Sequence, residues 1–367
     1  MRFSAVDAIT PALEHTKKQL FQPFRFGQWA RLALVGLLAG ELGSSGGCNS
    51  NSFNINQHGG TGRHFVEPAF SGIDPALLAV LIAVLVVAAL VLVIVLMYLS
   101  SVMRFILFDS VMAKECHIRE GWGRRQGPGV RFFLWKLAYL LVTLAGLVVL
   151  VGIPAGFAFA MGWLKEPKEH VIPLVLGGIL VFFALMIFFL VLAVVFVLTK
   201  DFVVPQMALE DIGVMEGWRR LWRMIEAEKG GYAGYIGMKI VMAIAAGIVV
   251  GIATLVLGLI LAIPTVAFSI IAVITGKTAG LTWNAYTITV AVVVGCVLLA
   301  IFLYVIALIS VPVIVFFPAY SIYFFAARYP ALSAVLYPAP PAPQIPPVAT
   351  PPPYEPPPVP PTPEPIG

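Results

Sequence analysis

The sequence has 367 residues, of which 60% are hydrophobic and 11% are charged, and its formal net charge is +5. Ordinary soluble domains contain roughly 25% charged residues, so this composition excludes a soluble globular protein and indicates a chain built for a lipid bilayer. The basic residues lie beside apolar segments instead of forming a separate polar domain, so we expect no nucleic-acid partner.

Apolar segments that reach or approach the ~20 residues needed to cross the hydrocarbon core of a membrane occur along most of the chain. In chain order they lie at about 25–43, 76–103, 132–163, 172–199, 233–263 and 285–317. The first is the weakest candidate, because it is short and contains Arg31. The sequence therefore predicts an all-α integral membrane protein with six transmembrane helices, arranged as three hairpin repeats.

The basic residues are distributed unequally between the two sides that these spans define. Nineteen of the 23 Lys and Arg residues fall in the segment up to Arg31, at 104–136, at 200–239 and at Arg328. Cytoplasmic loops carry an excess of Lys and Arg, so these segments are predicted to be cytoplasmic. We expect a protein of the bacterial cell (inner) membrane with both termini in the cytoplasm, and the phospholipid bilayer as its partner.

The outer loop after the first span, about 44–73, is rich in Gly, Ser and Asn and contains two histidines. Two histidines without a fixed third ligand do not make a metal site, so we expect neither a metal nor a cofactor. The three cysteines, Cys48, Cys116 and Cys296, fall outside, inside and within the last span, so no disulfide is expected.

The longest polar stretch in the middle of the chain is DFVVPQMALEDIGVMEGWRRLWRMIEAEK, residues 201–229. Its apolar residues recur every three or four positions, which predicts one amphipathic helix from Met207 to Ile225. The residues on its apolar face are Leu209, Ile212, Met215, Trp218, Trp222 and Ile225. We expect this elbow helix on the cytoplasmic membrane surface, with indoles at the headgroup boundary and arginines against anionic lipid. A solvated connector packed on its neighbours is the alternative.

An echo of this stretch occurs 96 residues earlier, which indicates an internal repeat. Glu120, Gly121, Trp122 and Arg124 align with Glu216, Gly217, Trp218 and Arg220, and Arg104 aligns with Lys200. We predict hairpin units at 1–110, 111–206 and 207–330, with cytoplasmic surface helices before the third and fifth spans. The first unit begins with a further surface helix over 5–22, whose apolar residues are Val6, Ile9, Leu13 and Leu20. The candidate lipid-interface residues are Trp122, Arg124, Trp218, Arg219, Arg220, Trp222 and Arg223.

Prolines are predicted to bend or interrupt the helices, because proline lacks an N–H donor and its ring clashes with the preceding turn. Kinks are expected at Pro154, Pro205, Pro264, Pro312 and Pro318. Pro205 would also turn the chain out of the fourth span into the elbow helix.

Residues 331–367 form a Pro-rich segment that we expect to be a disordered cytoplasmic tail. The PPPY sequence at 351–354 has the form of a ligand for an aromatic-lined groove, so a cytoplasmic protein could bind there. An inert spacer is the alternative.

No pattern typical of catalysis is found, and we predict that the protein is not an enzyme. The acidic residues near the inner ends of the spans are Asp109, Asp201, Glu210 and Asp211. We expect them to pair with Arg104, Lys200 and the elbow arginines.

The segments FQPFRFGQWARLAL at 21–34, DFVVPQMALED at 201–211 and EGWRR at 216–220 resemble an uncharacterised six-span bacterial family. That family is related to the membrane domain found beside some glycerophosphodiester phosphodiesterases. The resemblance implies a membrane module and does not imply an activity. The catalytic barrel of those enzymes, with its acidic residues and histidines, has no counterpart here.

The function expected from these observations is a non-enzymatic multi-pass membrane protein that binds or organises phospholipid at the cytoplasmic leaflet. The alternative is a membrane scaffold or transport subunit that recruits a cytoplasmic partner through its Pro-rich tail.

Overall fold

The computed structural model describes residues 4–41, 75–163, 165, 168–278 and 285–337. Within these ranges the regular elements are α-helices and two five-residue π-helices, and no strand occurs there. The expected all-helical class is therefore confirmed for the described part of the chain.

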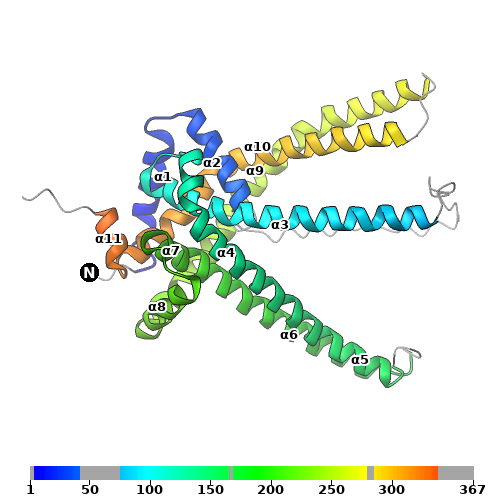
Figure 1. Cartoon of the computed structure of the whole chain (residues 1–367), viewed down its shortest axis with the longest axis horizontal. Coiled ribbons are helices and arrows are strands. Elements are labelled where there is room, and N and C mark those ends of the chain that lie inside the picture. Colours follow the sequence, from blue (N-terminus) through cyan, green and yellow to red (C-terminus); the bar gives the residue numbers. More distant parts are fainter. Residues whose placement is uncertain (1–3, 42–74, 164, 166–167, 279–284, 338–367) are drawn as a thin grey trace, which may run out of the picture.

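The helices form three arms that project from a packed base (Figure 1). The first arm is α3 (Pro75–Ala113). The second pairs α4 (Ile118–Leu147), η1 (Val148–Gly152) and α5 (Ile153–Ala160) with α6 (Val171–Leu198). The third pairs α9 (Lys229–Thr278) with α10 (Ala285–Ala326).

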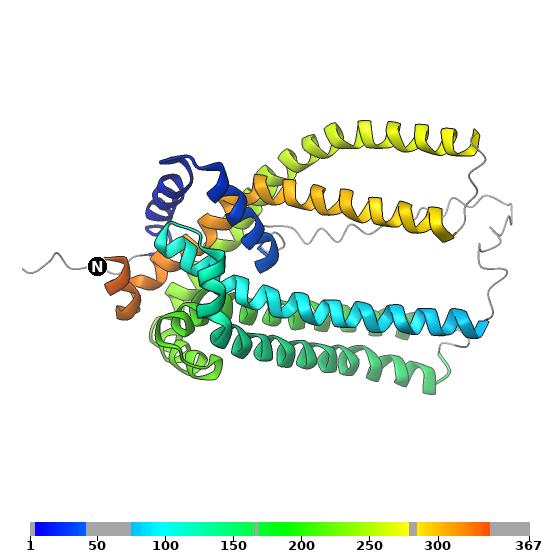
Figure 2. The ribbon, with the colours of Figure 1, turned by 45° about the horizontal axis from the view of Figure 1, so that its top comes forward.

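The base comprises the short helices together with the ends of the arms that meet them (Figures 1 and 2). Its short helices are α1 (Ile9–Phe21), α2 (Phe26–Ala39), η2 (Thr199–Val203), α7 (Val204–Glu210), α8 (Val214–Ala227) and α11 (Pro330–Leu336). The first and last helices of the described chain, α1 and α11, thus lie at the same end of the molecule.

Five helices in the described part of the chain are long and apolar enough to cross a membrane. They are Ile82–Ala113, Ile118–Ala160, Val171–Glu210, Lys229–Ala267 and Thr289–Ala326. Almost none of the residues in their most apolar stretches is buried inside the protein, as for Ile172, which is 81% exposed. Such a surface is typical of helices whose solvent is lipid.

The expected first span is not found as a spanning helix in the described residues. The corresponding helix α2 has 14 residues, or ~21 Å at 1.5 Å per residue, which is short of the ~30 Å hydrocarbon core. Gly40 ends it in the left-handed conformation with φ of 77°. Glu41, expected at the outer end of a span, instead lies in the base beside Arg104. The described structure thus has five candidate spans instead of six.

The prediction of a single elbow helix from Met207 to Ile225 was also wrong. Residues Val204–Glu210 continue the α6 arm as α7, and the helix ends where Asp211 takes a φ of 53°. A new helix, α8, begins at Val214. The proline at 205 therefore lies inside the inner end of the α6 arm and does not turn the chain out of it.

The other two expected surface helices also differ from the prediction, each in its own way. The segment before the third span is the first part of α4, which runs on through Pro128 without a break. The N-terminal helix is present as α1, but Leu13 on its expected apolar face is 60% exposed. Its buried residues are Ala12, His15, Thr16, Gln19 and Leu20.

Two of the five prolines expected to bend helices follow π-helices. Pro154 lies in the first turn of α5 directly after η1, and Pro205 in the first turn of α7 directly after η2. Proline clashes with the carbonyl four residues earlier, and a wider π-turn provides room for that clash. Pro312 and Pro318 lie inside α10, and position 264 lies within the bounds of α9.

Candidate functional site

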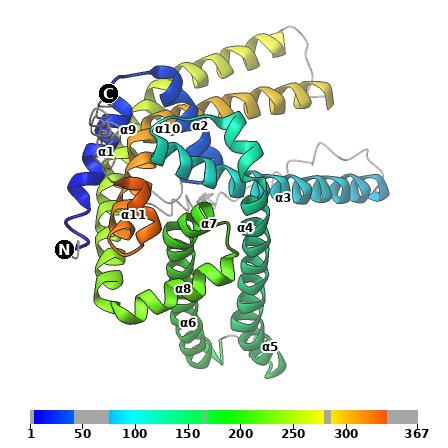
Figure 3. The same ribbon diagram turned by 60° about the vertical axis from the view of Figure 1, so that its left-hand side comes forward.

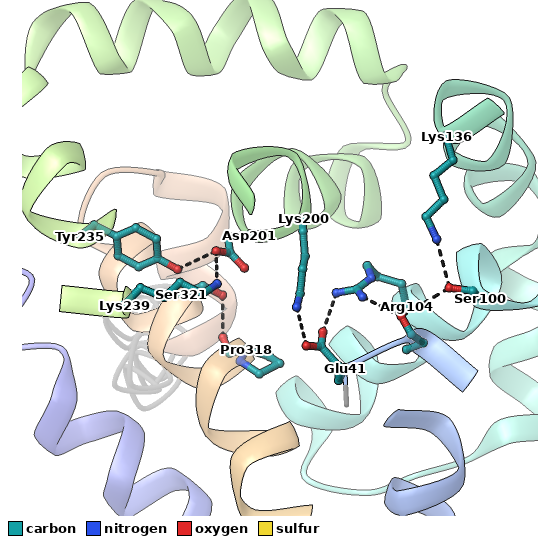
Figure 4. A network of polar contacts seen from close by, with 11 residues as sticks. Glu41, Ser100, Arg104, Lys136, Lys200, Asp201, Tyr235, Lys239, Pro318 and Ser321 are labelled. Atoms are coloured by element: carbon teal, nitrogen blue, oxygen red, sulfur yellow. Dashed lines mark hydrogen bonds and ion pairs between the residues drawn. The ribbon is translucent and has the colours of Figure 1, made fainter. Parts of the chain in front are cut away.

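Basic side chains from four arm helices meet at the base. They are Arg104 on α3, Lys136 on α4, Lys200 on η2 at the end of the α6 arm, and Lys239 on α9. Each follows or precedes more than twenty residues without Asp, Glu, Lys or Arg on its own arm. The four arm helices thus bring their basic side chains close together at the base (Figure 4).

Glu41 lies between two of these basic groups. Its Oε1 accepts a hydrogen bond of 2.5 Å from Nη1 of Arg104, and its Oε2 accepts one from Nζ of Lys200. Nη2 of Arg104 also donates to the carbonyl oxygen of Ala39 at 2.7 Å. All three charged side chains are at least nine-tenths buried. The carboxylate and the last turn of α2 are thereby fixed to the α3 and α6 arms.

Asp201 forms the second buried pair. Its Oδ2 accepts hydrogen bonds from Nζ of Lys239 and, at 2.9 Å, from the Tyr235 hydroxyl. Tyr235 stacks on Tyr320 of α10, with ring centroids 5.1 Å apart. This pair joins the α9–α10 arm to the α6 arm. We call Glu41, Arg104, Lys200, Asp201 and Lys239 the charge cluster.

The two neighbours Lys200 and Asp201 belong to η2, and Pro205 explains why a π-helix forms there. Proline has no N–H to offer the Asp201 carbonyl four residues earlier. The N–H of Val204 bonds to the carbonyl of Thr199, five residues back. Single π-turns inside α-helices often occur at functional sites, and this one carries both an acid and a base into the cluster.

Lys136 lies at the edge of the cluster and is half-buried. Its Nζ donates to Oγ of Ser100 at 3.0 Å and lies 5.1 Å from the centroid of the Phe132 ring. No ion pair to Lys136 is present among the described residues.

A cavity of about 30 Å³ lies inside the cluster, in the region drawn in Figure 4. Its lining residues are Glu41, Arg104, Leu107, Phe108, Lys200, Asp201, Val204, Pro205, Pro318, Ser321 and Ile322. Nε of Arg104 is buried and has no hydrogen-bond acceptor in the described structure. A buried N–H without an acceptor costs free energy.

The predicted lipid-interface residues fall into two groups. Arg124, Arg219, Trp222 and Arg223 are exposed. Trp122, Trp218 and Arg220 are only half-exposed and contact other parts of the base. The seven residues predicted to lie on one membrane-facing surface therefore do not share a single surface in the structure.

The half-exposed residues have specific partners. Nε1 of Trp218 donates to Oγ1 of Thr199 at 3.0 Å, and Trp122 meets the ring of Tyr98 edge to face at 6.2 Å. Arg220 forms ion pairs with Glu210 and, at 3.2 Å, with Glu216. These three residues thus stabilise contacts between helices at the base.

The acidic residues are paired, but partly with partners other than those expected. Both oxygens of Asp109 accept hydrogen bonds of 2.6 Å from Arg125, whose Nη1 also donates to the Ala208 carbonyl at 2.7 Å. Asp211 pairs with Arg131 at 3.1 Å. Only Glu210 pairs with an elbow arginine as predicted, Arg220.

Sequence reasoning missed Glu41, Lys136 and Lys239 as members of this site. The sequence did contain a signal for Lys136 and Lys239, because each is a basic residue at the inner end of a long apolar stretch. The position of Glu41 carried no such signal, since it follows a segment that reads as a span.

A family model described as a family of unknown function (DUF7544) matches residues 3–335. The chain belongs to this family. The DUF7544 match covers the base and all three arms and ends at residue 335, within α11. The expectation of a disordered tail from residue 331 was wrong for its first residues, because Pro330–Leu336 form this helix and Leu332 is buried. It supports the predicted membership of an uncharacterised family, whereas the relation to the membrane domain of glycerophosphodiester phosphodiesterases stays a prediction. No curated protein and no solved structure matches the chain.

Proposed function

We propose that this protein is a non-enzymatic membrane module that binds phospholipid at the cytoplasmic leaflet through its base. The observation that carries the proposal is the outward face of α8. Met215 is 74% exposed and Trp222 is 56% exposed on that face, and the side chain of Arg219 beside them is 73% exposed. Apolar and cationic side chains on one exposed helix face suit the boundary between headgroups and acyl chains.

The position of α8 supports the same function. It crosses the base between α7 and the start of α9 (Figure 3) and buries Val214, Gly217 and Leu221 against its neighbours. One face of α8 is thus used for folding, and the opposite face is left for lipid.

A second apolar surface lies between α1 and α2. Phe21, Phe24 and Phe26 are 53%, 59% and 64% exposed, and Arg25 among them is exposed too. The rings of Phe21 and Phe24 both contact Trp29, whose Nε1 donates to the Leu308 carbonyl of α10 at 2.8 Å. Aromatic residues are enriched at membrane interfaces, so this surface supports contact of the base with the leaflet.

The alternative function is a scaffold or transport subunit that recruits a partner through residues 338–367. These residues lie outside the described structure. The preceding helix α11 belongs to the base, so a tail that continues from it starts on the side where we place the cytoplasm. The positive-inside bias is the reason for that placement, with both termini cytoplasmic in the bacterial inner membrane.

The test compares lipid retention between variants of the full-length protein. The protein is reconstituted in nanodiscs of phosphatidylcholine with or without phosphatidylglycerol, and native mass spectrometry counts the lipids retained after gentle release. Arg219→Gln/Arg223→Gln should lose most of the preference for phosphatidylglycerol. The matched variant Arg219→Lys/Arg223→Lys keeps the charge and should retain that preference.

Equal retention of phosphatidylglycerol by the Gln and Lys variants would overturn the proposal. The scaffold alternative has its own test, in which the chain lacking residues 338–367 is compared with the full chain for a co-purifying protein. Loss of a stoichiometric partner upon that deletion, with lipid retention unchanged in all variants, would favour the scaffold.

A further inference from the structure

Aromatic side chains gather at the turn between α1 and α2, at the edge of the base (Figure 2). Phe21, Phe24 and Phe26 are each more than half exposed. The rings of Phe21 and Phe24 both have their centroids 5.6 Å from that of Trp29, at interplanar angles of 78° and 56°. We call Phe21, Phe24, Arg25, Phe26 and Trp29 the aromatic surface. Clustered aromatic rings of this kind bind peptides in the polyproline II conformation.

The chain itself contains a ligand of that chemistry. We call residues 338–367 the proline tail, because 16 of these 30 residues are proline. Proline-rich sequences favour polyproline II before they bind, so their docking on aromatic side chains costs little conformational entropy. The PPPY sequence at 351–354 places Tyr354 next to Glu355.

The proline tail starts close to α1. Tyr337, which follows α11, interacts electrostatically with Tyr323, whose hydroxyl lies 3.2 Å from Nδ1 of His15 on α1. His15 and Phe21 are six residues apart on the same helix, or ~9 Å along its axis. In the polyproline II conformation residues 338–354 would extend over ~50 Å, so the PPPY sequence can reach the aromatic surface.

The charges of the two partners are complementary. The proline tail contains Glu355 and Glu364 and no Lys or Arg. Residues 9–31 contain four basic residues and one acidic residue, Glu14, which pairs with Lys18 at 3.9 Å. Arg25 lies within the aromatic surface and is exposed. Complementary charges of this kind favour specific docking and fix its register.

We propose that the proline tail docks on the aromatic surface of its own chain, with the PPPY sequence against Phe21, Phe24 and Trp29 and Glu355 beside Arg25. A tethered segment acts at an effective concentration on the order of 1 mM. A segment whose dissociation constant as a free peptide is about 100 µM would then be docked about nine-tenths of the time.

Docking also regulates lipid contact. The docked tail covers a surface that otherwise touches the leaflet, so tail and phospholipid compete there. This consequence rests on the proposed lipid-binding function, whereas docking itself does not.

The test uses the full-length protein in phosphatidylcholine nanodiscs with p-benzoylphenylalanine in place of Phe24, which keeps an aromatic ring at that position. Light links this residue to whatever touches it, and mass spectrometry identifies the product. The wild-type tail should be captured within the same chain. Full-length protein with Ser at positions 351–354 should lose most of this capture and should be linked to phospholipid instead.

Two further comparisons address where and how the proline tail binds. With the same photoreactive residue at position 13, where Leu13 is 60% exposed on α1 outside the aromatic surface, little of the tail should be captured. Arg25→Gln should lower tail capture at position 24 and remove its dependence on salt, because ion pairs between exposed charges are screened by salt.

Capture of phospholipid alone at position 24 with the wild-type tail would overturn the docking proposal and leave the proposed lipid-binding function intact. A crosslinked product of twice the mass on a denaturing gel would show that the tail comes from a second copy, and equal tail capture at positions 13 and 24 would show that docking is not specific. Either result would overturn docking within one chain. Capture of the wild-type tail, with no phospholipid captured in the Ser variant, would support docking and overturn the competition with lipid.

Discussion

Arg104 and Lys200, which lie 96 residues apart, bind the two oxygens of one carboxylate, that of Glu41. The same spacing relates the two Glu-Gly-Trp segments. A Cβ on Gly121 would meet Ile106 at 3.2 Å, and one on Gly217 would meet Val203 at 2.7 Å. In both segments the glycine lies against the helix that precedes it. These contacts agree with the predicted repeat, whose three complete units stay a prediction.

The carboxylate of Glu41 is expected to be essential for the stability of the base. Glu41→Gln leaves Arg104 and Lys200 with one less counter-charge, which should lower the free energy of unfolding by about 3–5 kcal/mol. Adding Lys200→Met restores the original charge balance, so the double variant should recover much of the loss. Denaturant unfolding in detergent micelles measures both effects.

The control for this experiment is Lys17→Met, which removes an exposed charge from α1 and should change stability little. A double variant that is less stable than Glu41→Gln would contradict the charge-balance argument.

Close approach of α3 and α4 requires a glycine at position 129. A Cβ there would lie 2.7 Å from Cγ2 and 3.3 Å from Cα of Val102. Gly129→Ala should therefore destabilise the protein by about 1–3 kcal/mol. Gly127→Ala is the matched control, because nothing lies within 4 Å of its Cβ position, and alanine there should stabilise the helix by about 0.5–1 kcal/mol. Thermal unfolding distinguishes the two, and equal effects would contradict the proposed contact.

The arms could be predicted from sequence because their signal is local. An uninterrupted apolar run such as 76–103 can be satisfied only in lipid, and its backbone must then be helical. The positions of Pro154 and Pro205 likewise marked irregular turns, although the π-helical form of those turns was not predicted. The short α2 was misread, because a 14-residue apolar helix and a marginal span have similar composition.

The faces of α8 could not be predicted from periodicity alone. In a membrane protein an apolar side chain can face either the protein core or lipid, and both readings follow the same helical spacing. Gly217 allows α8 to approach Val203 closely, which turns Trp218 inward and leaves Met215 and Trp222 outward. The charge cluster was equally hidden, because the partners of Glu41 come from arms distant in sequence.

Acidification should loosen α1 through His15. This ring is 5% exposed, and Nε2 lies 2.9 Å from the Val111 carbonyl, to which it donates, while Nδ1 lies 3.2 Å from the Tyr323 hydroxyl. Burial lowers the pKa of His15 below 6.5, and the charges of Lys114 and Lys18 add to the effect. The undocked helix therefore binds a proton before the docked one does.

Acidification should therefore destabilise the docked form, because a state that binds more protons is favoured as pH falls. The unfolding midpoint should decrease as pH falls through about 6.5 towards the lower pKa of the docked form. His15→Gln, which does not titrate, should reduce this dependence. His117→Gln is the control, because His117 is exposed and its replacement should leave the pH profile unchanged. The same pH profile in wild type and His15→Gln would exclude His15 as the cause.

The two indoles of α8 should report different surroundings. Trp222 is 56% exposed, and its Nε1 donates to Glu226 of the same helix at 2.7 Å, whereas Nε1 of Trp218 donates to Thr199 in the base.

In nanodiscs with phosphatidylglycerol brominated near the ester end of its acyl chains, bromine quenches only tryptophans that reach that depth. Trp222→Phe should therefore remove part of the quenchable fluorescence and leave the unfolding midpoint unchanged. Trp218→Phe should leave quenching unchanged and cost about 1 kcal/mol of stability, because it loses one hydrogen bond. If Trp222→Phe leaves quenching as it is, α8 does not lie at the lipid boundary, and its arginines face water instead.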